Sequence, residues 1–215
     1  MVQQGRGAFR AALAAAQRLR TVGHEQGLRL YEALGTTTQG SVWVQEGELD
    51  RGLTLLTTGL AHYCRLGNQA SLTFFLSCLA EAHRRRGQVA EGLAVIGEAI
   101  QLTETHFAHF WTAELYRLQG ELLLAQAGQG CPATAPEVAT AEACFQQALA
   151  IARQQGAKAL ELRAALSLSR LWRAQDNHAA AQGLVAGCYN GFSEGWDTAD
   201  LQAAHEVLAH GHPVT

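Results

Sequence analysis

The sequence predicts an all-α protein made of helix hairpins that stack on one another along the chain. Three observations support this fold. The 215 residues contain only three prolines, the residue that most firmly breaks a helix. Apolar side chains recur three and four positions apart, which is the spacing of one helix face. A motif of small, large and small residues also returns at similar intervals along the chain.

The motif occupies four segments that align without gaps: 47–60, 87–100, 137–150 and 176–189. In each, a small residue is followed four positions later by an apolar one and three positions after that by a second small one. The four sets are Gly52/Leu56/Gly59, Gly92/Ile96/Ala99, Ala141/Phe145/Ala148 and Ala181/Val185/Cys188. This spacing places the three side chains on one face, where small residues let a neighbouring helix approach closely. The last members are 40, 49 and 40 residues apart.

A preceding helix in each unit carries a small residue followed three positions later by a larger side chain. These pairs are Gly40/Trp43, Ala80/His83, Gly120/Leu123 and Ser169/Trp172. A small residue beside a large one suits two helices that cross tightly. Each unit is therefore predicted to be a hairpin of two helices.

The predicted helices follow in chain order from these motifs and from helix-stop glycines such as Gly67, Gly87 and Gly156. They span 6–22, 27–46, 48–66, 69–86, 89–104, 107–126, 137–155, 157–175, 178–190 and 197–210. They form the hairpins 27–66, 69–104, 107–155 and 157–190, preceded by a half repeat at 6–22 and followed by a capping helix at 197–210. The whole chain, 1–215, is predicted to be one domain.

The segment 127–136, "AGQGCPATAP", interrupts the third hairpin and accounts for its longer interval. Its glycines and prolines predict a loop. Two interpretations stay open: an insertion tolerated at the surface, and a flap that contacts a partner.

The repeat resembles the tetratricopeptide repeat (TPR) in the long-period form found in bacterial regulators. The segments 113–125, 141–172 and 191–208 are similar to the C-terminal region of large bacterial proteins that join an ATPase module, often with a nucleotide cyclase domain, to such an array. This resemblance implies a right-handed superhelical solenoid that serves a signalling or transcription-regulatory ATPase system. The chain lacks the proline that usually ends the second helix of the short repeat, so the angles between repeats need not match.

Catalytic motifs of the related ATPases are missing from the sequence. It contains no GxxxxGK[ST], and its single lysine, Lys158, follows no glycine-rich loop. No GxSxG nucleophile motif occurs either. We therefore predict a protein that is not an enzyme and needs no cofactor.

The charge pattern argues against a nucleic-acid partner and the hydropathy pattern against a membrane. The formal net charge is −3, whereas nucleic-acid binders carry a strongly basic face. No run of eighteen apolar residues and no signal peptide is visible. The five cysteines are widely spaced without a CxxC pair, and four lie in apolar helical patterns, so a cytoplasmic location is expected.

The histidines and cysteines are the residues of this sequence that could serve as metal ligands or nucleophiles. His106 and His109 are three apart, and His205, His210 and His212 cluster near the end of the sequence. Neither group has a cysteine or carboxylate at a familiar distance, and HExxH is absent, so no metal site is predicted. Cys131, in the loop, is the expected exposed thiol.

The resemblance implies that the first helix of each hairpin lines a concave groove. The charged residues predicted to face it are Glu81, Arg84, Arg85, Glu114, Arg117, Glu121, Arg163, Arg170 and Arg173. Because guanidinium groups bind carboxylates in pairs of hydrogen bonds, the expected partner is a protein or acidic peptide. For Arg84 to Arg86, a solvated helix end is the equal alternative.

A self-associating structural module with no separate ligand is the alternative function. An array must cover its terminal repeats, and the first helix offers Ala11, Leu13, Ala14 and Leu19 without an evident cover. Such a module would form a homodimer through a terminal repeat.

Overall fold

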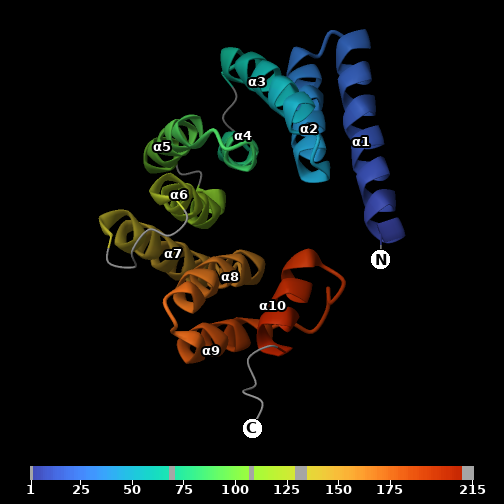
Figure 1. Cartoon of the computed structure of the whole chain (residues 1–215). Coiled ribbons are helices and arrows are strands. Elements are labelled where there is room, and N and C mark those ends of the chain that lie inside the picture. Colours follow the sequence, from blue (N-terminus) through green and yellow to red (C-terminus); the bar gives the residue numbers. More distant parts are fainter. Residues whose placement is uncertain (1, 68–70, 107–108, 129–134, 210–215) are drawn as a thin grey trace. The chain divides into compact units, whose positions relative to one another are not determined.

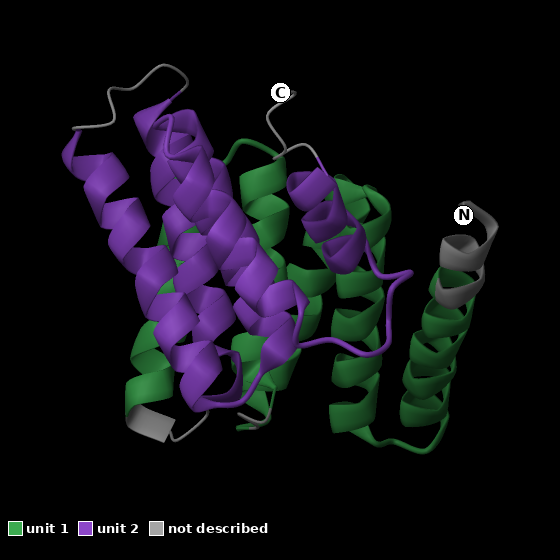
Figure 2. Cartoon of the chain, turned by 90° about the horizontal axis from the view of Figure 1, so that it is seen from below, with its two compact units in different colours: residues 1–108 green, residues 109–215 purple. Residues whose placement is uncertain are grey.

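The computed structural model describes residues 2–67, 71–106, 109–128 and 135–209, with side chains from residue 9 onward except those of 105 and 106. Over these ranges the chain is all-α, with ten α-helices, one short 3-10 helix and no strand. It divides into two compact units, residues 1–108 and 109–215, coloured separately in Figure 2. The all-α prediction is confirmed.

Unit 1 holds the first five helices, labelled in Figure 1. They are α1 (Val2–Glu25), α2 (Arg29–Glu46), α3 (Leu49–Arg65), α4 (Leu72–Arg85) and α5 (Val89–His106). Each helix packs against the next one along the chain, and α2 also packs against α4. In this unit helices thus pack in chain order, with α2 and α4 as the next-but-one pair that also packs together.

Unit 2 repeats this arrangement with the remaining elements. They are η1 (His109–Trp111), α6 (Thr112–Ala127), α7 (Pro136–Gln154), α8 (Lys158–Ala174), α9 (His178–Tyr189) and α10 (Ala199–Ala209). Consecutive helices again pack together, and α6 contacts α8 as α8 contacts α10.

Burial confirms the small-large-small motif in all four segments. The central residue is fully buried in each: Leu56, Ile96, Phe145 and Val185. A Cβ atom added to Gly40 would lie 2.6 Å from the backbone nitrogen of Leu56, and one added to Gly120 would lie 2.5 Å from Cε1 of Phe145. Glycine on the first helix thus makes room for the large residue of the second.

The last residues of the helices agree with the prediction to within two residues, except at α1, which was expected to stop at residue 22 and stops at Glu25. Three starts differ more: α1 begins at Val2 instead of 6, α4 at Leu72 instead of 69 and α6 at Thr112 instead of 107. Gly67 and Gly87 have φ values of 69° and 78°, the left-handed conformation that ends a helix. Gly23 instead lies inside α1, because it marks a helix crossing rather than a stop. A Cβ there would lie 2.5 Å from the backbone nitrogen of Glu32 on α2.

None of the described helices combines the length and the apolar character needed to cross a membrane.

Candidate functional site

The nine residues predicted to line a groove lie on the first helices of three hairpins. Glu81, Arg84 and Arg85 are on α4, in unit 1, while the other six are on α6 and α8, in unit 2. Nearly all of these arginines already contact an acceptor of the chain itself. The two units hold them in different ways.

In unit 1 the arginines contact acceptors within α4 and on the neighbouring helices α2 and α3. Arg84 donates from Nε and Nη2 to the two carboxylate oxygens of Glu81, at 2.7 and 2.8 Å. Arg85 donates to the backbone carbonyl of Val44, near the end of α2. Arg86 forms an ion pair with Asp50 at the start of α3. These contacts give the arginine run a structural role at the end of α4.

In unit 2 the network begins with a buried ion pair inside α6. Arg117 donates from Nε and Nη2 to the two carboxylate oxygens of Glu114, at 2.9 and 2.8 Å. Only 9% of the Arg117 side chain and 6% of the Glu114 side chain are exposed. A buried guanidinium needs such a fixed carboxylate, because leaving either charge unpaired is costly. The Arg117 guanidinium and the Glu114 carboxylate therefore neutralise each other inside the fold and do not face a partner.

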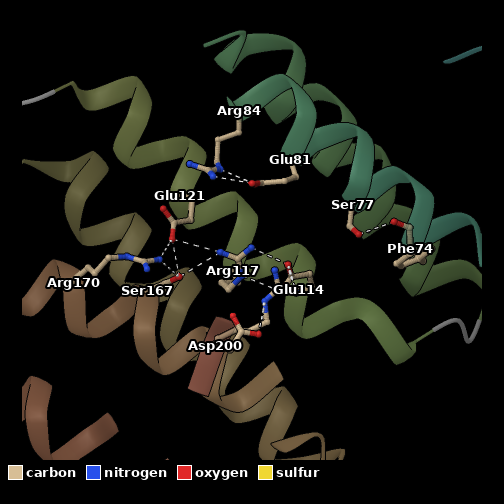
Figure 3. A network of polar contacts seen from close by, with 11 residues as sticks. Phe74, Ser77, Glu81, Arg84, Glu114, Arg117, Glu121, Ser167, Arg170 and Asp200 are labelled. Carbon is tan, nitrogen blue, oxygen red and sulfur yellow. Dashed lines mark hydrogen bonds and ion pairs between the residues drawn. The ribbon is translucent and has the colours of Figure 1, made fainter. Parts of the chain in front are cut away.

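Glu121 joins α6 to α8 (Figure 3). Its Oε1 accepts hydrogen bonds from Ser167 Oγ and from Arg170 Nη2, both at 2.7 Å, and lies 3.5 Å from Arg117 Nη1. Burial alone would raise the pKa of this carboxyl, but the hydrogen bond from Ser167 and the charges of the two arginines outweigh it. The pKa of Glu121 therefore lies below its usual value, and the group stays ionised.

Arg163 links the same network to α10. Its Nη1 lies 3.1 Å from Glu114 Oε1, and its Nε lies 3.7 Å from Asp200 Oδ2. Three arginines and three carboxylates thus join α6, α8 and α10. The three positive and three negative charges balance. Because the ion pairs cross from α6 to α8 and from α8 to α10, the cluster holds these helices together.

Arg170 lies at the open edge of the cluster. Its side chain is 60% exposed, and Nη2 makes both of its polar contacts, to Glu121 and, at 3.1 Å, to Ser167. Its Nε and Nη1 have no acceptor among the described residues. Two fixed contacts on Nη2 orient the guanidinium, and the N–H groups of Nε and Nη1 can still each donate a single charge-assisted hydrogen bond to a further carboxylate. Arg173, one turn further along α8, is exposed as well.

A half-open pocket of about 280 Å³ lies beside Arg170. Its polar wall includes Glu121, Ser167, Arg170 and Gln175, and its apolar wall includes Leu124, Val138 and Leu171. This volume is slightly below the range usual for small-molecule sites. The pocket therefore suits one or two aliphatic side chains next to a group that binds arginine.

The sequence analysis found the charged residues of this site but did not predict which of them are buried and paired with one another. It placed Glu114 and Arg117 on an open surface, whereas both are buried. It missed Ser167, which is three positions before Arg170 on the same helix face and could have been found from that spacing. Asp200 comes from another helix, and no local pattern indicates it.

Thiols and metal ligands form no second site in the described residues. Cys64 is exposed, contrary to the expectation of an apolar environment, whereas Cys144 and Cys188 are buried. Burial, followed by the nearby Glu161 carboxylate, raises the pKa of Cys188 to about 11. In the parts of the chain that the structure describes, no three potential metal ligands come together. The side chain of His106, and residues 129–134 (with Cys131) and 210–215 (with His210 and His212), lie outside the described residues.

The fold defines the chain as an all-α protein whose helices pack in chain order within each unit. One solved structure similar to it is the crystal structure of BtubC (BKLC) from P. vanneervenii, with a TM-score of 0.65. The match has 16% sequence identity and covers 95% of this chain and 89% of that one. At this identity the similarity concerns the fold alone. No protein-family model matches the chain, and no curated protein matches it significantly.

Proposed function

We propose that the chain is a TPR-like solenoid module that binds a protein or acidic peptide and catalyses no reaction. Contacts between next-but-one helices support this proposal, because they are the contacts that stack hairpins into a solenoid. In unit 1 they join α2 to α4, and in unit 2 they join α6 to α8 and α8 to α10. The repeated small-large-small motif is consistent with the same architecture.

The exposed edge of Arg170 beside an apolar pocket carries the binding proposal. Glu114, Arg117 and Arg163 serve the fold, so the contact with a partner falls to Arg170 and Arg173. A peptide with an aliphatic side chain next to Asp or Glu would fill the pocket and pair with the guanidinium. In a cell, the module would act as the cytoplasmic sensor or scaffold of a bacterial signalling or transcription-regulatory ATPase system.

The test is a binding measurement with fluorescent peptides. A library pairing each aliphatic residue with Asp or Glu is titrated by anisotropy, and each hit is repeated with Asn or Gln in place of the acid. For a hit, Arg170→Gln should weaken binding about tenfold or more, because it removes a charge-assisted hydrogen bond and the positive charge that attracts the acid. The Asn or Gln peptide should lose a similar amount.

Arg153→Gln is the matched control in this experiment. Arg153 is 56% exposed, and its Nε is paired with Glu161 at 2.7 Å, much as Arg170 is paired with Glu121, but it lies on α7. If the two variants lost peptide affinity equally, binding would depend on the net charge of the protein and not on the position of Arg170. Absence of any acid-dependent hit would overturn the proposal.

Self-association is a second candidate, supported by an exposed apolar group in unit 1. Val22, Leu28, Tyr31 and Leu66 are between 43% and 47% exposed. They lie where α1 ends, α2 begins and α3 ends. On α1 itself, Ala11 and Ala14 are exposed, while Leu13 and Leu19 are half-buried.

Light scattering over a range of concentrations tests this candidate. A homodimer that Leu28→Glu or Tyr31→Glu dissociates would support it. A monomer at every concentration would exclude it.

A further inference from the structure

A second pocket, of about 440 Å³, lies in unit 1 where α1, α2 and α3 meet. Six of its seven lining residues are polar; they are Gln17 and Arg20 from α1, Gln39 from α2, and Asp50, Arg51 and Thr54 from α3. The volume falls within the range of small-molecule sites, but an apolar guest would meet almost no apolar wall. The composition points to a charged, strongly hydrogen-bonding ligand.

Positive charge exceeds negative charge in this pocket. Arg20 and Arg51 have no carboxylate partner among the described residues. Asp50 is the one acidic side chain in the lining, and Arg86, which is not a lining residue, forms an ion pair with it. The charge of Asp50 is thus compensated by Arg86, directly after α4, and the guanidinium groups of Arg20 and Arg51 are left to attract an anion.

Two donors, the exposed Arg51 and the buried Gln39, have contacts within the chain before any ligand arrives. Cζ of Arg51 lies over the Trp43 ring, 3.9 Å from its centroid, a cation–π contact that restrains the guanidinium. Gln39 is only 4% exposed. Its carboxamide donates one long hydrogen bond, 3.5 Å from Nε2 to the carbonyl of Ala16. The buried amide therefore keeps hydrogen-bonding capacity toward the pocket.

We propose that this pocket binds the phosphoryl group of a small organic phosphate. A carboxylate offers two oxygens in one plane, whereas a phosphate monoester offers three terminal oxygens around one centre. Two guanidinium forks and a carboxamide can reach such a group from different sides. The proposal is independent of the peptide-binding proposal, because the residues belong to unit 1 and none of them lies at the Arg170 pocket.

The test titrates the full-length protein with inorganic phosphate and with O-phosphoserine, using serine and sodium chloride at equal ionic strength as blanks. Binding is read from ¹⁵N-resolved signals of the Gln39 side-chain amide and of the arginine Nε–H groups. Both phosphates should shift Gln39 and Arg51 saturably. Serine and chloride should not.

Three variants locate the site. Arg20→Gln and Arg51→Gln should each weaken phosphate binding about tenfold to a hundredfold, since each removes charge-assisted hydrogen bonds. Arg51→Lys should also weaken binding, because it keeps the charge but loses the stacked fork. Arg18→Gln makes the same charge change at an exposed position of α1 that does not line the pocket, and should bind normally.

Three results would overturn the proposal. One is a linear, unsaturated drift of all arginine signals, which would mean general ion screening. A second is an equal loss of phosphate binding from Arg18→Gln and Arg51→Gln. Binding of O-phosphoserine without inorganic phosphate would show that the seryl part supplies the affinity, and it would equally reject a phosphoryl site.

Discussion

Replacing Gly120 with alanine tests how the first and second helices of a hairpin fit together. In an exposed helix interior, Gly→Ala stabilises by about 1 kcal/mol, because alanine has the higher helix propensity. At Gly120 the new Cβ would lie 2.5, 2.8 and 2.9 Å from three atoms of the Phe145 ring. Because Phe145 is fully buried, the ring has little room to move away. Overpacking of this kind costs about 1–3 kcal/mol, so we expect Gly120→Ala to be destabilising by about 1 kcal/mol.

The second change of the cycle is Phe145→Leu, which removes the ring. In that background the same Gly120→Ala substitution should become neutral or stabilising, which gives a coupling energy of about 1–2 kcal/mol. Gly183→Ala on α9 is the control, since a Cβ there meets nothing within 4 Å. It should stabilise the protein in both backgrounds.

The assay is urea unfolding followed by circular dichroism at the helix band, for all four members of the cycle and the control. If Gly120→Ala stabilises the protein as much as Gly183→Ala does, α6 and α7 do not cross at this point. The packing derived from the motif would then be refuted.

Three further predictions concern the polar network and the thiols. Arg117→Leu should cost about 3 kcal/mol in urea unfolding, because the buried Glu114 carboxylate loses its bidentate partner and keeps the ion pair with Arg163. Arg84→Leu removes a pair whose side chains are 31% and 28% exposed and should cost about 1 kcal/mol or less. Equal costs would contradict the burial of the α6 pair. Because the pKa of Glu121 is lowered on folding, its carboxylate stabilises the folded state at pH values above its unfolded pKa, near 4.5, and this stabilisation is lost as the pH falls through the folded pKa. Glu121→Gln should therefore make the free energy of unfolding fall less steeply with decreasing pH below about pH 4.5. An unchanged pH dependence would show that the pKa of this carboxylate does not change on folding. In native alkylation at pH 8 followed by peptide mapping, exposed Cys64 should be modified well before buried Cys188, whose thiol stays protonated; the reverse order would contradict this burial.

The sequence predicted the helices and their crossing points because those depend on local spacing. A small residue four positions before a large one and three positions after it defines a helix face without any knowledge of the neighbours. Thus Phe145 and Val185 could be placed in the core from their own segments. The end of α1 was predicted three residues too early, at 22 instead of Glu25, because a glycine such as Gly23 can mark either a helix stop or a point of close approach.

The candidate site could be predicted only in part, because the state of a charged side chain depends on residues distant in sequence. Arg117 and Arg170 both fall on the predicted inner face of a first helix. Arg117 pairs with Glu114 of its own helix, and this pair is buried. Arg170 pairs with Glu121 of a different helix and stays exposed. The packing of α8 on α6 decides which of the two arginines is buried. This packing cannot be predicted from the sequence of either helix alone.

Proton distances across the two glycine crossings test the central claim most directly. In unit 1 a Cβ on Gly40 would lie 2.9 Å from Cγ of Leu56, and in unit 2 Gly120 faces the ring of Phe145. A nuclear Overhauser spectrum should therefore show strong cross-peaks from the Hα protons of Gly40 to the Leu56 side chain and from those of Gly120 to the Phe145 ring. Missing cross-peaks at both crossings, in a protein that is fully helical by circular dichroism, would contradict the hairpin packing proposed for the repeat.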